Sequence, residues 1–295
     1  MATYVLLNAE SGRGAAARRW SRLERTARAI FPDLTVITGS RSEELQSAAR
    51  QIATDGTPST IIAAGGDGTS HLVVNALLDA EPGHQTAMAW LPIGSGNDLA
   101  RAIGIPLRLP DCLHAYQDRH RATIDAGRVE YTSLNGEPAH RWFGNSFSVG
   151  LTADVIRIAA RRGKALGGRA GYFLAAIEAV AGHSSASYRL TIDGEPADLG
   201  RCGLVAITNG STFGAGMRVS PAASLTDGQL DLLWLADLSR TGTLGLLPRI
   251  YWGGHLNHPA VTARRIHRVG VTGDGPIGFE ADGELVEGRL PLVVE

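Results

Sequence analysis

Lysine is nearly absent from this sequence, in which Lys164 is the only lysine among 28 basic residues. A phosphate-binding loop of the Gly-Lys-Ser/Thr type is therefore excluded, so a nucleotide would have to be held without that lysine. Excess positive charge is also missing, because the formal net charge is −1. This near-neutral balance argues against a nucleic-acid-binding protein, which usually carries a large basic excess.

Cysteine and long apolar runs are scarce as well. Cys112 and Cys202 lie far apart and lack the paired spacing of a zinc site or a disulfide framework, which indicates a reducing cytoplasm. No apolar run approaches the length of a membrane-spanning helix. Residues 1–8 lack the basic leader and the apolar length of a signal peptide, so we expect them to form a first strand.

Length and apolar content predict two compact domains, which we place at residues 1–122 and 123–295. In the first, short β-branched runs alternate with segments of helical spacing. Strands are predicted at residues 4–7, 34–38, 60–64 and 86–91, and helices at 15–30, 43–54, 70–80, 97–103 and 111–117. This alternation predicts a parallel sheet covered on both faces, with ligands at the carboxyl ends of its strands.

The second domain is predicted to be rich in β-structure. Alternating segments are separated by turn sequences such as Asn135-Gly136 and Asp193-Gly194, which favour hairpins. We expect a β-sandwich or barrel with one or two inserted helices.

Two glycine-rich turns are the strongest functional signal, Gly65-Gly66-Asp67-Gly68-Thr69 and Pro92-Ile93-Gly94-Ser95-Gly96-Asn97-Asp98. Each follows an apolar run and opens a helical pattern, so glycines and free N–H groups at a helix start would attract phosphate oxygens. Asp67 would repel phosphate unless a cation lies between them, which indicates Mg²⁺ or a proton-transfer role. A tight strand-to-helix connection with a capping aspartate is the alternative, and it explains one such turn better than two.

These turns, together with Gly94 to Arg101, Asp227-Gly228-Gln229-Leu230-Asp231 and Asp282-Gly283-Glu284, resemble the catalytic-domain family of diacylglycerol kinases. That family includes soluble bacterial lipid kinases and the sphingosine and ceramide kinases. The resemblance spans nearly the whole chain. The first motif alone also resembles NAD kinases and phosphofructokinases, but the ordered set is specific. It implies an α/β nucleotide-binding domain, a β-sandwich-type second domain, and transfer of the γ-phosphate of ATP to a lipid hydroxyl.

The resemblance also implies the ATP-binding residues. Ser40 is an alternative to Thr38, with a shift of register. At Ser70-His71-Leu72 the chain departs from the family pattern of a hydrophobic residue, Asn and Glu, which places His71 either at the nucleotide rim or on a solvent-facing helix surface. The implied residues are Asn8, Ala9, Glu10, Ser11, Gly12, Thr38, Gly65, Gly66, Asp67, Gly68, Thr69, Ser70, His71, Ser95, Asn97 and Asp98.

For catalysis, the resemblance favours Glu284 as the general base, with Asp67 essential as a nucleotide or metal partner. Related sphingosine kinases use the loop aspartate as base, so both assignments stay open. The resemblance implies a Mg²⁺ site at Asp227 with the carbonyls of Ser224 and Gln229, whose oxygens suit a hard cation. A plain Asp-Gly turn is the alternative.

Residues 154–169 contain Arg157, Arg161, Arg162, Lys164 and Arg169, with no acid after Asp154. On a helix, Arg157, Arg161 and Lys164 would share a face able to rest on anionic headgroups. An ordinary solvated face is the alternative. We expect peripheral contact with the inner membrane face, where the lipid substrate lies, and leave a homodimer open.

The sequence ends at Glu295, earlier than many family members, which continue into a segment that returns to the first domain. We therefore expect most of that segment to be missing, and leave open whether the final strand returns to the first domain.

The acceptor lipid is the least determined feature. Diacylglycerol, giving phosphatidic acid, is the first expectation; phosphatidylglycerol, sphingoid bases, ceramide and monoacylglycerol are the alternatives. An NAD kinase fits the late motifs less well. A silent nucleotide-binding regulator is disfavoured because Asp67, Asp98, Asp227 and Glu284 are intact, and a binding module needs no base.

Overall fold

The computed structural model describes residues 2–80, 85–118, 120–162, 168–273 and 275–295. The chain divides into two compact units, residues 1–123 and 124–295. This division falls one residue after the boundary predicted from the sequence.

The first unit is built on a four-stranded parallel sheet with the order β2-β1-β3-β4. Its strands are β1 (Ala2–Asn8), β2 (Leu34–Gly39), β3 (Ser59–Gly65) and β4 (Ala87–Pro92). Its helices are α1 (Ser11–Gly14), α2 (Ala16–Ile30), α3 (Ser42–Thr54), α4 (Asp67–Leu78), α5 (Asp98–Ile103) and α6 (Leu109–Ala115). The predicted parallel α/β fold is confirmed. Between β1 and α2, residues 11–14 form a helical turn, closed by the Gly14 N–H donating to the Glu10 carbonyl.

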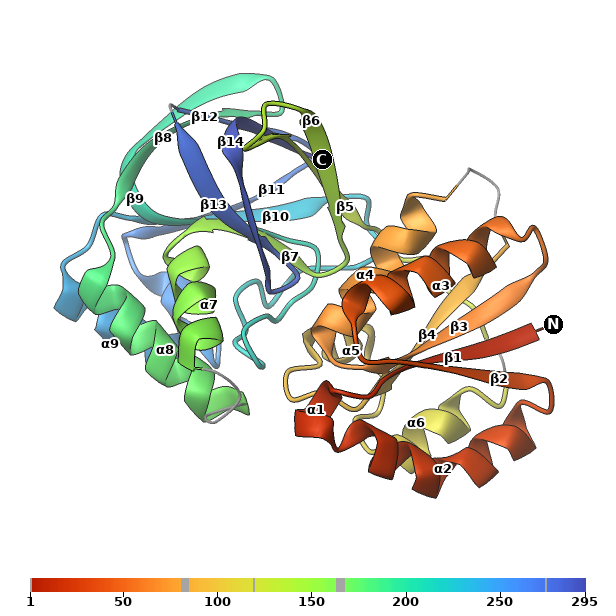
Figure 1. Ribbon diagram of the computed structural model, residues 1–295. Coiled ribbons are helices and arrows are strands. Elements are labelled where there is room, and N and C mark those ends of the chain that lie inside the picture. Colours follow the sequence, from red (N-terminus) through yellow and green to blue (C-terminus); the bar gives the residue numbers. More distant parts are fainter. Residues whose placement is uncertain (1, 81–84, 119, 163–167, 274) are drawn as a thin grey trace. The chain divides into compact units, whose positions relative to one another are not determined.

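Helices cover both faces of this sheet, as Figure 1 shows. On one face, Trp20 and Leu23 of α2 pack with Cys112 and Leu113 of α6 against the strands. On the other face, α3 and α4 bury their apolar side chains against Leu6, Ile61 and Ala63. Because the four strands run parallel, the turns that follow them all lie at one edge of the sheet.

The second unit is an antiparallel β-structure whose strands form a closed ring. The path β9-β7-β13-β14-β12-β8 returns to β9, because β8 pairs with both β12 and β9. The β10–β11 and β5–β6 pairs extend from β9 and β14. The strands are β5 (Gly127–Ser133), β6 (Pro138–Phe143), β7 (Ser146–Gly150), β8 (Ala186–Ile192), β9 (Glu195–Thr208), β10 (Leu230–Ala236), β11 (Val261–Ile266), β12 (Val269–Thr272), β13 (Pro276–Ala281) and β14 (Glu284–Val294).

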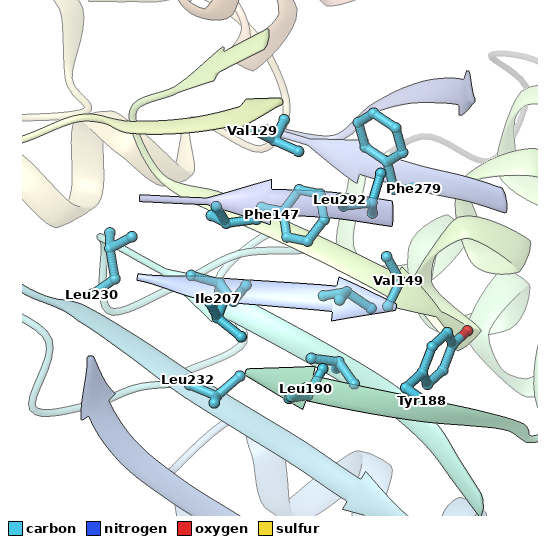
Figure 2. Packing of buried hydrophobic residues seen from close by; sticks show 14 of the residues in the cluster. Val129, Phe147, Val149, Tyr188, Leu190, Ile207, Leu230, Leu232, Phe279 and Leu292 are labelled. Atoms are coloured by element: carbon cyan, nitrogen blue, oxygen red, sulfur yellow. The ribbon is translucent and has the colours of Figure 1, made fainter. Parts of the chain in front are cut away.

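The core of this ring is aromatic and aliphatic. Phe147 of β7 and Phe279 of β13 have ring centroids 5.5 Å apart, and both side chains are fully buried. Figure 2 shows them among side chains from β5, β8, β9, β10 and β14. The strand-rich prediction is confirmed, and the final strand β14 belongs to this sheet, since it pairs with β13, β12 and β5.

Helices of the second unit are more numerous than predicted. One or two were expected, whereas its described part contains α7 (Leu151–Arg162), α8 (Gly168–Gly182), α9 (Arg240–Ile250) and the short 3₁₀ helix η2 (Gly254–Asn257). The first three pack together through Leu151, Val155, Val180 and Leu247. Among the described residues, no helix has the length and apolar character needed to cross a membrane.

Candidate active site

The two glycine-rich turns touch each other at the carboxyl edge of the first unit's sheet. The Gly65 carbonyl accepts hydrogen bonds from the N–H groups of Ile93 and Gly94, both at 2.9 Å. A Cβ atom on Gly94 would lie only 2.3 Å from the Cα of Gly66, so the backbones pack with no room for a side chain. The two turns therefore lie side by side, as expected for loops at the carboxyl ends of neighbouring parallel strands.

Asp67 fastens the second turn to the first. One of its carboxylate oxygens accepts the N–H of Asn97 and the other accepts the N–H of Asp98, each at 2.7 Å. A Cβ on Gly96 would lie 2.3 Å from the same carboxylate, which explains the glycine there. The sequence assigned Asp67 to a nucleotide, metal or base role; the geometry adds a structural one, because its charge is held by two backbone amides.

Asn97 shapes the second turn. Its φ of 57° is in the left-handed region, and its side-chain amide donates to the Gly94 carbonyl at 2.9 Å. Asp98 follows as the buried first residue of α5, whereas Ser95 is exposed at the tip of the turn. Of the predicted residues in this turn, Ser95 is thus the accessible hydroxyl.

The turn after β1 lies against the same two loops. The side-chain amide of Asn8 donates to the hydroxyl of Thr69 at 3.0 Å, which joins the β1 edge to the first turn of α4. Arg19 of α2 donates to the Ile93 carbonyl at 2.7 Å, while a Cβ on Gly12 would lie 3.1 Å from that oxygen. Asn8 and Gly12 therefore lie against the two glycine turns, and their role in binding ATP stays a prediction. Arg19 was missed, because nothing in its helical surroundings marks it in the sequence.

Thr38 and Ser40 both lie at the carboxyl end of β2. Thr38 is exposed and paired in register with Leu7 of β1, which places it beside the Asn8 turn. The Ser40 N–H donates to the Glu44 carboxylate at 3.3 Å, at the start of α3. Asn8 pairs with Gly39, and the Ala9 N–H donates to the Gly39 carbonyl at 3.0 Å, so Thr38 and Ser40 flank the residue that contacts the β1 turn and both stay candidates.

His71 is buried, with 6% of its surface exposed, so the solvent-facing alternative is wrong. Its ring lies 3.3 Å from the side-chain amide of Asn75, one turn further along α4. The reason is the environment of α4, in which residues 69–77 are all buried. Ser70 is buried as well, and its hydroxyl donates to the Gly66 carbonyl at 3.3 Å.

In the second unit, Asp282-Gly283 forms the two-residue turn of the β13–β14 hairpin. Both residues have positive φ, 52° and 84°, as this tight hairpin geometry requires. The Asp282 carboxylate accepts three backbone N–H groups, from Gly144 at 2.9 Å, Asn145 at 2.8 Å and Ser146 at 3.1 Å. Asp282 thus anchors the turn, and Glu284, the exposed first residue of β14, is the carboxylate open to a reactant.

A second hairpin repeats this local sequence. Asp193-Gly194 joins β8 to β9 with φ values of 50° and 90°, and it is followed by the exposed Glu195. Local sequence alone therefore does not distinguish Glu195 from Glu284.

The predicted metal-binding turn is already engaged in protein contacts. One carboxylate oxygen of Asp227 accepts the Gln229 N–H at 3.2 Å, and the other lies 3.5 Å from the Arg265 guanidinium. The Ser224 hydroxyl accepts the Thr226 N–H at 3.4 Å. Among the described residues, no three histidine, cysteine or acidic side chains lie together where they would hold a metal ion. The carbonyls of Ser224 and Gln229, which are the other predicted ligands, take no part in these contacts, so the Mg²⁺ assignment stays a prediction.

Ion pairs with acidic residues engage part of the basic face that was expected on α7. Arg157 forms ion pairs with Asp154 at 2.8 Å and with Glu287 of β14 at 2.9 Å. Arg161 is exposed. Lys164 lies outside the described residues, so the predicted grouping of three cations on one face stays a prediction.

Comparison with known proteins agrees with this geometry. Residues 2–129 match the family described as the diacylglycerol kinase catalytic domain, and residues 145–295 match the YegS C-terminal NAD kinase beta sandwich-like domain. A diacylglycerol kinase of Mycobacterium tuberculosis is 28% identical over 292 residues, covering 99% of this chain and 90% of that protein. A diacylglycerol kinase of Bacillus subtilis is 31% identical over 241 residues, covering 78% of this chain and 72% of that protein.

Solved structures share the fold. A diacylglycerol kinase structure from Bacillus anthracis str. Sterne superposes with a TM-score of 0.73 at 17% identity, covering 100% of this chain and 93% of that one. Another structure from the same organism reaches a TM-score of 0.80 at 20% identity with the same coverage. Together with the two domain matches, the paired glycine turns and the Asp-Gly-Glu hairpin show that the chain belongs to the diacylglycerol kinase family of lipid kinases.

Proposed function

We propose that this protein transfers the γ-phosphate of ATP to a lipid hydroxyl, with diacylglycerol as the first candidate acceptor. The observation that carries the proposal is the contact between the two glycine turns, fastened by Asp67 at the carboxyl edge of a parallel sheet. Ligands of such sheets bind at this edge. The relatives named diacylglycerol kinase support the choice of acceptor.

The first unit suits the binding of ATP phosphates. The backbone at Gly66 and Gly94 carries no side chains, and α4 begins at Asp67, so its first N–H groups favour an anion. Thr38 and the turn after β1 supply the remaining predicted contacts. Phosphoryl transfer depends mainly on positioning and on charge stabilisation, which such a backbone cradle provides. We propose that Mg²⁺ accompanies ATP, and the Asp227 turn stays the predicted site for a bound ion.

The second unit supplies the general base in this proposal. Glu284 is exposed at the start of β14. The turn before it is held in place by the hydrogen bonds that the Asp282 carboxylate accepts from three backbone N–H groups. A carboxylate that takes the proton of the acceptor hydroxyl is worth about 10²- to 10⁴-fold in rate. Asp67 is the alternative base, but both of its oxygens already accept backbone amides.

The test is a lipid kinase assay with the Glu284→Gln variant. The protein is incubated with labelled ATP, Mg²⁺ and vesicles containing diacylglycerol, then with a panel of the other candidate lipids and with NAD⁺. We expect label in the lipid fraction for the wild type, a loss of at least about 100-fold for Glu284→Gln, and unchanged ATP binding.

Glu195→Gln is the matched control, because it removes the same carboxylate after the same Asp-Gly turn on β8–β9. It should retain wild-type activity. Loss of turnover in this variant with retention in Glu284→Gln would assign the base to the other hairpin. Transfer of label to NAD⁺ and to none of the lipids would show that the protein is an NAD kinase and not a lipid kinase.

A further inference from the structure

Glu280 is a fully buried carboxyl group behind the Asp282-Gly283-Glu284 turn. It lies on β13, two residues before Asp282, with 2% of its surface exposed. One carboxyl oxygen accepts the Gly283 N–H at 2.8 Å, and the other accepts the Ser148 hydroxyl at 2.7 Å. Burial raises its pKa to about 7, against the lowering effect of these hydrogen bonds. Burying a carboxyl group costs free energy, so its presence here indicates a structural or functional role.

The hydrogen bonds of Glu280 continue to α7. Ser148 of β7 also shares a hydrogen bond with the hydroxyl of Thr152, in the first turn of α7, and either hydroxyl can be the donor. This buried chain works in both protonation states. When Glu280 is charged, Ser148 donates to it; when Glu280 is protonated, its O–H donates to Ser148, which donates to Thr152. The Gly283 N–H is accepted in either case.

The second hairpin shows that the turn itself does not need this carboxyl. Asp193-Gly194 has nearly the same φ values as Asp282-Gly283, and the residue equivalent to Glu280 is the exposed Thr191. The same turn therefore forms without a buried carboxyl behind it. What Glu280 adds is a fixed connection between the turn that carries Glu284, the strand β7 and the start of α7.

We propose that Glu280 is a positioning residue, which fixes the Gly283 backbone so that the Glu284 carboxylate is held in place for the acceptor hydroxyl. This inference rests on the proposed role of Glu284. Small displacements of a catalytic group lower turnover strongly, whereas ATP binding depends on residues of the first unit.

The test compares Glu280→Met, which keeps a similar volume without hydrogen bonds, with Glu280→Gln. The glutamine carbonyl can accept the Gly283 N–H and its amide can donate to Ser148. We expect kcat to fall between about tenfold and a hundredfold in Glu280→Met at an unchanged KM for ATP, and to return to within about threefold of wild type in Glu280→Gln. The aspartate side chain of Glu280→Asp is too short to reach Gly283, so this variant should behave as Glu280→Met does. It replaces Glu280→Met in the test if Glu280→Met fails to fold.

Hydrogen exchange at the Gly283 amide tests the geometry without catalysis. We expect about tenfold faster exchange in Glu280→Met and Glu280→Asp, and near wild-type exchange in Glu280→Gln. Phe279→Leu, a packing change at the adjacent buried residue of β13, is the control and should leave Gly283 exchange and kcat near wild type at a comparable loss of stability.

The outcomes separate the two proposals. Faster Gly283 exchange in a protein that phosphorylates no lipid would overturn the proposed function while supporting the anchor. Unchanged exchange, or an equal loss of kcat in Phe279→Leu, would overturn the positioning role of Glu280 while leaving Glu284 as the base.

Discussion

The buried carboxyl of Glu280 predicts a specific pH dependence of stability. Its pKa is raised from an ordinary value of 4.5 to about 7, chiefly because burial disfavours the charged form. Between these two values the folded protein binds a proton that the unfolded chain has released. The free energy of unfolding should therefore decrease as the pH rises through this window.

The magnitude follows from the size of the shift. A difference of about 2.5 pKa units corresponds to about 3 kcal/mol, at about 1.4 kcal/mol per unit. The contribution of Glu280 is favourable below pH 4.5 and is lost by about pH 7. Glu280→Gln cannot ionise, so its stability relative to wild type should rise by about 3 kcal/mol over the same interval and then stay level.

The assay is urea unfolding of both proteins at half-unit steps from pH 4 to pH 8.5, followed by circular dichroism and tryptophan fluorescence. Subtracting one protein from the other at each pH removes the contribution of groups that both share. Phe279→Leu removes no titrating group and should give a curve parallel to wild type. A difference between wild type and Glu280→Gln that stays constant across the window would refute the burial argument.

Three further predictions concern the first unit and α7. Gly94→Ala places a Cβ 2.3 Å from backbone of the other turn and should abolish ATP binding in calorimetry, whereas Gly245→Ala, which meets nothing within 4 Å, should be tolerated. Asp67→Asn turns an amide group toward a backbone N–H, so unfolding should become easier by about 1–3 kcal/mol and ATP affinity should fall; an unchanged urea midpoint would contradict this. Arg161→Gln should weaken sedimentation with anionic vesicles about fivefold and the ion-paired Arg157→Gln less, while equal effects would argue against α7 as the membrane-facing helix.

Local sequence determined much of this protein. The strands and helices of the first unit follow the spacing of apolar residues, because each βα unit buries one helix stripe and one strand against its neighbours. Parallel strands bring their following turns to one edge, so the meeting of the two glycine turns was predictable as well. The Asp-Gly hairpins could also be read from the chain, since their positive φ values restrict which residues fit.

Tertiary structure decided what lies behind these turns. The two-residue period of β13 puts Phe279 in the core and Glu280 on the opposite face, where α7 packs against the sheet. His71 is also buried by tertiary packing, since residues 69–77 of α4 are all buried. Arg157 meets Glu287, a residue 130 positions away. A contact between two segments far apart in the chain leaves no periodic pattern in the sequence of either segment. Only the folded chain therefore distinguishes the Glu284 hairpin, which has the buried Glu280 behind it, from the Glu195 hairpin, which has no such residue.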